Sequence, residues 1–125
     1  MEQLKIAARW KIHEGKIEEF KSLAKECHAA VMKKNPQHMQ YDWYFNDELS
    51  ECVILETYPD SNALLMHLSI VGEFLGRFLA LGEFKPEVFG KPSKELLDAT
   101  ASMDKKIYYF YQGVGQLNKT SSSLS

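Results

Sequence analysis

A short apolar segment that ends in a tight turn limits what this chain can fold into. Residues 52–55 are Cys-Val-Ile-Leu, so a strand over them is apolar on both faces and needs cover on both. Glu56 interrupts this apolar run, and Pro59 ends the strand because proline lacks the amide donor of a ladder. Asp60 or Ser61 can then cap a helix. This segment therefore predicts a buried strand, a tight turn and the start of a helix.

The helix predicted after this turn carries a histidine within an apolar stretch. The apolar neighbours of His67 are Leu64, Leu65, Leu68 and Ile70. An acid, Glu56, and an imidazole thus lie in the two most apolar elements of the chain. The same helix contains Gly72 and Gly76, each of which destabilises a helix interior by about 1 kcal/mol relative to Ala. We therefore expect a break or kink near residues 70–72, or close backbone packing at the two glycines.

The rest of the sequence predicts one α+β domain. Hydrophobic periods of two and of about 3.6 residues indicate the strands and helices. In chain order these are a strand at 4–12, a helix at 16–34, strands at 40–45 and from residue 51, a helix at 61–81, a strand at 83–89, a short helix after Ser93 and a strand at 107–112. This order is typical of a ferredoxin-like antiparallel sheet with its helices on one face. Pro86 confines the strand around it to an edge of the sheet.

Composition excludes several classes of partner. The chain has 125 residues, 45% of them hydrophobic, which is enough for one domain with its own core. A formal net charge of −2 without a basic stripe argues against binding of nucleic acid or of an anionic membrane surface. No apolar run approaches the roughly 20 residues that a membrane span needs.

Localisation and domain limits are predicted from the same composition. The N-terminus begins directly with strand alternation and has no apolar signal-peptide region. Cys27 and Cys52 fall on predicted core faces, where free thiols in a reducing compartment are expected. We therefore predict a cytoplasmic protein with one domain over residues 1–117, followed by a disordered polar tail over residues 118–125.

Three short motifs occur in order along the first two-thirds of the chain. A strand ends in a glycine turn before an acidic helix at residues 11–20, and a proline marks the entry to a tyrosine-containing strand at 35–41. A Glu, an aromatic residue and an Asp follow at 56–60, with His67 in the next helix. Together these motifs resemble the antibiotic biosynthesis monooxygenase family, whose members have the dimeric α+β barrel fold. The resemblance covers about residues 4–81.

The sequence departs from the family pattern at two positions. Gln37 stands where the family often has Gly after the proline, and Tyr58 stands where Trp is common after the Glu. The resemblance implies that the final strand of the fold lies at residues 107–112, and that the segment 83–103 is an insertion relative to simpler members.

The resemblance also implies a homodimer, an activity and a ligand class. Family members pack two sheets face to face, which would cover the second apolar face of the strand at 52–55. Some oxidise quinols or polycyclic phenols with O2 and without metal, flavin or haem, which implies a monooxygenase without cofactors and a small aromatic or quinone-like ligand. Others degrade haem, but the first strand lacks the Asn that those relatives place there. A ligand-binding or structural dimer without catalysis is the alternative.

Glu56 and His67 are the candidate catalytic residues. Burial would raise the pKa of Glu56 toward the range of a general base. His67 would act as the base or share a hydrogen bond with a substrate hydroxyl. Each residue also has a structural interpretation, as a carboxylate satisfied by neighbouring donors and as a histidine of the core.

Five further residues are candidates for contacting the substrate. An aromatic ring can stack on a planar ligand and orient it through a polar tip. The candidates are Tyr41, Trp43, Tyr58, Phe74 and Arg9, the last of which is either exposed to solvent or stabilises an anion inside the cavity. The spacing of the histidines matches no zinc motif, and no Gly-rich phosphate loop precedes a helix, so neither a metal nor another cofactor is expected.

Overall fold

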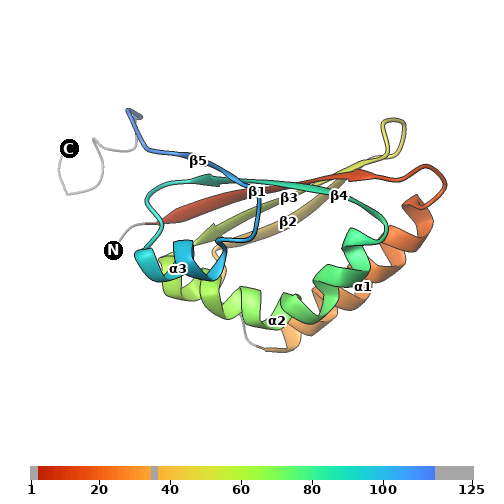
Figure 1. Cartoon of the computed structure of the whole chain (residues 1–125), viewed down its shortest axis with the longest axis horizontal. Helices are drawn as coiled ribbons and strands as arrows, with labels where there is room; N and C mark the ends of the chain where they lie inside the picture. Colours follow the sequence, from red (N-terminus) through yellow and green to blue (C-terminus); the bar gives the residue numbers. More distant parts are fainter. Residues whose placement is uncertain (1–2, 35–36, 115–125) are drawn as a thin grey trace.

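A sheet with helices packed on one side forms the structure, a computed structural model that describes residues 3–34 and 37–114 (Figure 1). Its elements are β1 (Leu4–Ile12), α1 (Ile17–Lys33), β2 (Gln40–Asn46), β3 (Glu51–Tyr58), α2 (Ser61–Leu79), β4 (Gly82–Phe89), α3 (Lys94–Ala99) and β5 (Lys106–Tyr108). The elements predicted as far as α2 are confirmed, with ends that differ by a few residues.

The strands are ordered β2-β3-β1-β4-β5 across the sheet. β1 lies at the centre, antiparallel to both β3 and β4, and β2 is antiparallel to β3. β5 runs parallel to β4, so the sheet is mixed and not wholly antiparallel as predicted. The first four strands, together with α1 and α2, form the ferredoxin-like arrangement that the element order indicates.

β4 is the fourth strand of this arrangement, whereas the family resemblance implied that residues 107–112 would be this strand. It pairs with β1 along its whole length, so the start of the segment 83–103 is part of the fold and not an insertion. β5 pairs only with the last three residues of β4. β4 is therefore not the edge strand that was predicted, because β5 lies beyond it. Pro86 itself still has no strand on its outer side, as a proline in a sheet requires.

β5 is much shorter than the predicted closing strand. Only Lys106–Tyr108 are in the strand, and the aromatic side chains of Tyr109, Phe110 and Tyr111 are exposed. β4 ends at the same place: the N–H of Gly90 still donates to the main-chain oxygen of Tyr108 at 2.9 Å, but its φ of 125° departs from strand geometry.

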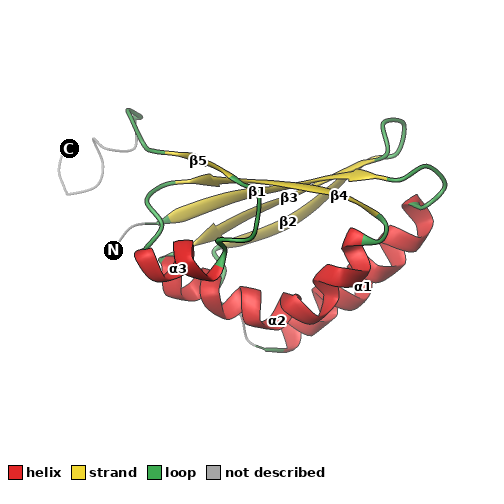
Figure 2. Ribbon diagram, in the orientation of Figure 1, coloured by secondary structure: helices red, strands yellow, loops and turns green. Residues whose placement is uncertain are grey.

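All three helices lie on the same side of the sheet (Figure 2). Alternate side chains of β1 are buried beneath them, as the period of two predicts. Trp10 is at the centre of this core, stacked on Phe84 with 4.4 Å between ring centroids and edge-on to Phe20 of α1 at 5.6 Å. Both cysteines, Cys27 and Cys52, are buried here as free thiols.

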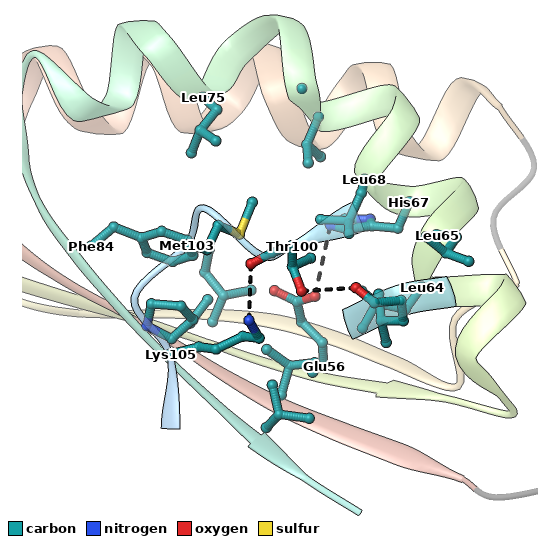
Figure 3. Close-up of a pocket in the computed structure, with 18 of the residues that line it drawn as sticks. Glu56, Leu64, Leu65, His67, Leu68, Leu75, Phe84, Thr100, Met103 and Lys105 are labelled. Atoms are coloured by element: carbon teal, nitrogen blue, oxygen red, sulfur yellow. Dashed lines mark hydrogen bonds and ion pairs between the residues drawn. The ribbon is translucent and has the colours of Figure 1, made fainter. Parts of the chain in front are cut away.

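α2 begins at the predicted turn. Asp60 Oδ1 accepts a hydrogen bond from the main-chain N–H of Ala63 at 2.9 Å and so caps the helix. The helix continues without a break through Gly72 and Gly76, and Figures 1 and 3 both show it bending along its length. A Cβ atom at either glycine would meet nothing within 4 Å, so the expected close packing at the glycines is wrong.

No helix in the described part of the chain is long and apolar enough to cross a membrane. The polar tail predicted for residues 118–125 lies outside the described residues.

Candidate functional site

A cavity of about 430 Å³ lies between the sheet and the helices α2 and α3. Its volume falls within the roughly 300–1,000 Å³ of small-ligand pockets. Most of the lining side chains are apolar, among them Ile6, Trp10, Ile54, Leu68, Leu75, Phe84 and Met103. Its polar lining residues include Glu56, His67, Thr100 and Lys105 (Figure 3).

Strand alternation and helical spacing bring Glu56 and His67 together. Glu56 shares the inner face of β3 with Ile54 and Tyr58, and His67 lies one turn after Leu64 on the inner face of α2. Each side chain is only 6% exposed, and 3.7 Å separates His67 Nε2 from Glu56 Oε1. The structure therefore places both predicted catalytic residues side by side on the cavity lining.

Among the described residues, the hydroxyl of Tyr58 is the close hydrogen-bond donor to Glu56. This hydroxyl donates to Glu56 Oε1 at 2.5 Å. Burial raises the pKa of Glu56 to about 7, and the hydrogen bond from Tyr58 opposes the rise. Near neutral pH the carboxyl group is thus divided between its two protonation states, which suits an acid or base that must exchange a proton during turnover.

His67 is a neutral imidazole at the same pH. Burial, together with a smaller effect of the neighbouring His38, lowers its pKa to about 3. The 3.7 Å contact with Glu56 is therefore not an ion pair at neutral pH. His67 can accept or donate a hydrogen bond there, but its pKa makes it a weaker base than Glu56.

His38, which sequence reasoning missed, completes a chain of polar groups. Its Nε2 lies 2.8 Å from His67 Nδ1, so one of the two rings donates a hydrogen bond to the other. The groups run in the order Tyr58, Glu56, His67 and His38. Burial lowers the pKa of His38 as well. Its position depends on a contact between the segment just before β2 and α2, and no local pattern in the sequence signals this.

Tyr41 and Trp43 line the cavity as predicted for the inner face of β2. Burial raises the pKa of the Tyr41 hydroxyl, which therefore remains protonated. Trp43 Nε1 is buried and has no hydrogen-bond partner among the described residues. An unsatisfied buried donor of this kind can bind an oxygen atom of a ligand.

The structure places the other predicted contact residues outside the cavity. Tyr58 is buried next to Glu56, to which its hydroxyl donates, but it does not line the cavity. Phe74 is buried in the core, with the guanidinium of Arg77 over its ring. Arg9 is on the opposite face of the sheet, where its Nε is 3.0 Å from a carboxylate oxygen of Glu87. Alternation along β1 requires this, because Trp10 points into the core. Of the two positions considered for Arg9, the exposed one is correct.

The segment between α3 and β5 forms a part of the cavity lining that sequence reasoning also missed. Thr100, Met103 and Lys105 come from this segment. Within residues 3–34 and 37–114, no group of three or more His, Cys, Asp or Glu side chains is arranged to hold a metal ion.

Solved structures of other proteins share this fold. MupZ from Pseudomonas fluorescens matches with a TM-score of 0.74 and 22% sequence identity, over 97% of this chain and 98% of MupZ. SnoaB, a cofactor-independent oxygenase from Streptomyces nogalater, matches with a TM-score of 0.59 and 18% identity, over 74% of this chain and 95% of SnoaB. A protein described as an antibiotic biosynthesis monooxygenase matches with a TM-score of 0.58 and 22% identity, over 68% of this chain and 92% of its own.

No protein-family model matches the sequence. No functionally curated protein is significantly similar to it. The match with MupZ extends over nearly the whole chain and so includes α3 and β5, whereas the other two leave at least a quarter of this chain unmatched. The structural matches establish that this chain has the fold of the antibiotic biosynthesis monooxygenases.

Proposed function

We propose that the protein is a cofactor-independent monooxygenase that oxidises a quinol or polycyclic phenol with O2. The observation that carries this proposal is a buried carboxyl group with a pKa of about 7 on the lining of an apolar cavity. Such a group is matched to proton abstraction from a phenolic hydroxyl near neutral pH. SnoaB, which has the same fold, is a cofactor-independent oxygenase, and this supports the reaction class.

Glu56 acts as the base in this proposal, and His67 as a hydrogen-bonding partner. Of the two roles predicted for His67, base or hydrogen-bond partner, this proposal keeps the second. A pKa of about 3 makes the imidazole of His67 a poor proton acceptor from a phenol. Its neutral ring instead orients the substrate hydroxyl or the Glu56 carboxylate, with His38 fixing which nitrogen carries the proton.

The chemistry then requires only the substrate and oxygen. Removal of the hydroxyl proton gives an electron-rich phenolate, which transfers an electron to O2. The two radicals combine to form a carbon–oxygen bond, and the hydroperoxide loses water as its O–O bond breaks. Overall, one quinol and one O2 give one hydroxyquinone and one water, with all four electrons supplied by the quinol. The apolar lining keeps bulk water away from these intermediates, and the Trp43 N–H is available to a substrate oxygen.

Oxygen consumption with a panel of quinols and polycyclic phenols tests this function. With isotopically labelled O2, we expect one labelled atom in the organic product and the other in water, and no accumulation of hydrogen peroxide. Heat-unfolded protein is the control for spontaneous oxidation. If the panel members bind in the cavity but no oxygen is consumed, the result supports a ligand-binding protein and not an oxygenase.

We further propose that two copies of the chain associate through the uncovered face of the sheet. Four exposed large apolar or aromatic side chains lie on this face, namely Tyr44, Leu55, Phe89 and Tyr108. A two-fold contact would cover them on both copies at once, because an isologous interface uses the same patch twice. This dimer would also cover the second apolar face of β3.

Light scattering during size exclusion should give twice the chain mass of 14.4 kDa at micromolar concentration. Leu55→Glu should shift the protein toward the monomer, since it places a charge at the centre of the proposed interface. Met66→Glu is the matched control, because Met66 is similarly exposed but lies on α2. A wild-type protein that elutes with the mass of one chain contradicts the dimer.

A further inference from the structure

A lysine lies on the lining of the mostly apolar cavity. Lys105 reaches it from the segment between α3 and β5, whereas His67 reaches it from α2 (Figure 3). The Lys105 ammonium donates one hydrogen bond, at 2.9 Å, to the main-chain oxygen of Thr100. An ammonium has three N–H donors, so two are left for other partners.

Lys105 has no protein counter-ion in the described part of the chain. The ion pairs formed there use other cations, such as Arg9 with Glu87 and Lys94 with Asp98. Glu56 is the one carboxyl group among the described lining residues, and it does not pair with Lys105. An ammonium beside an apolar surface, without a neutralising partner, is complementary to an anionic group of a ligand.

The position of Lys105 differs from that of a lysine whose stem only covers apolar surface. Such a lysine extends its ammonium group into water. Here the side chain is half-buried, and the hydrogen bond to Thr100 holds the ammonium against the rim of the cavity. Lys106, the next residue, points to the exposed face of β5 instead and is absent from this cavity.

We propose that Lys105 binds the carboxylate of an otherwise apolar aromatic substrate, whose reacting hydroxyl lies against Glu56 and His67. This inference rests on the proposed function in that it takes the cavity as the substrate site. It adds the substrate class, which is an aromatic carboxylic acid that also carries a phenolic hydroxyl. The carboxylate fixes the orientation of the ring, so that the hydroxyl and not the acid group faces Glu56.

Calorimetric titration with naphthoate and with naphthamide tests the proposal, because the two probes share a ring system and differ in charge. At about pH 6 the naphthoate is ionised, since aromatic acids have a pKa of about 4, and Glu56 is mostly neutral. Wild-type protein should bind naphthoate about tenfold more tightly than naphthamide. Lys105→Met should abolish this preference, and Lys105→Arg should retain it.

Lys106→Met is the matched control and should keep the wild-type preference. Thermal unfolding of each variant verifies that the fold is intact, and the arginine variant keeps the test valid if the methionine variant does not fold. The proposal is overturned if Lys105→Met retains the preference, if wild-type protein shows none, or if it binds neither probe. If the protein consumes oxygen with phenolic substrates but binds naphthoate no more tightly than naphthamide, the role of Lys105 alone is refuted. If it binds naphthoate more tightly but consumes oxygen with no phenolic acid, the oxygenase function alone is refuted.

Discussion

Replacing Glu56 with Gln is expected to lower kcat for any quinol that the protein oxidises by about 100-fold or more, the usual contribution of a general base. The amide has nearly the same shape as the carboxyl group, and its oxygen can still accept the hydrogen bond from Tyr58. It cannot accept a proton near neutral pH. Steady-state oxygen uptake measures the change, and unfolding experiments verify that the variant is folded.

The pH dependence of the rate gives a second test of the same residue. The wild-type rate should rise with pH and level off above about 7, the pKa to which burial raises Glu56. Tyr58→Phe should move this rise to higher pH, because the hydrogen bond from Tyr58 lowers the pKa and its loss leaves burial unopposed. Glu87→Gln is the matched control, since Glu87 pairs with Arg9 on the outer face. A Glu56→Gln variant with unchanged kcat would remove Glu56 from the proposed mechanism.

Alternation along single strands was sufficient to predict much of the site. It placed Tyr41 and Trp43 on one face of β2, and it put an acid among the inward-facing residues of β3. The turn at Pro59 and the helix after it then placed His67 opposite Glu56. These positions depend on periods of two and of about 3.6 residues, which the sequence displays directly.

Features that depend on contacts between distant segments could not be predicted in this way. His38 reaches the site because the segment just before β2 contacts α2, and Lys105 reaches the cavity because α3 packs beside α2. For a similar reason, the sequence could not show that β4, and not residues 107–112, is the fourth strand of the ferredoxin-like arrangement. Both segments are apolar enough to be strands, and only the pairing with β1 decides which belongs to the fold.

The protonation states of the site also required the structure. The sequence shows an acid and a histidine in apolar elements, but the size of each pKa shift depends on how completely the side chain is removed from water. Both residues are almost fully buried, so burial favours the neutral form of each. That result makes Glu56 the better base and His67 the neutral partner.

Glu56 and His67 should affect stability in opposite directions as the pH changes. Burial raises the pKa of Glu56 from 4.5 to about 7, so between these values the folded protein holds a proton that the unfolded chain has released. Glu56 should therefore lower the free energy of unfolding by about 3 kcal/mol as the pH rises through this range. Burial lowers the pKa of His67 from 6.5 to about 3, so the unfolded chain binds the extra proton. His67 should lower the free energy of unfolding by about 5 kcal/mol as the pH falls through that range.

Single variants separate the two opposing effects. Glu56→Gln leaves His67 unopposed, so it should lose about 3 kcal/mol of unfolding free energy as the pH falls from 6.5 to 4.5. His67→Gln leaves Glu56 unopposed, so it should gain about 3 kcal/mol as the pH falls from about 7 to 4.5. Ionisable groups that do not contact the pair are the same in both variants, so they cancel in the difference between the two curves. Urea unfolding at a series of pH values measures both curves. Parallel curves would show that burial does not hold either residue in its neutral form.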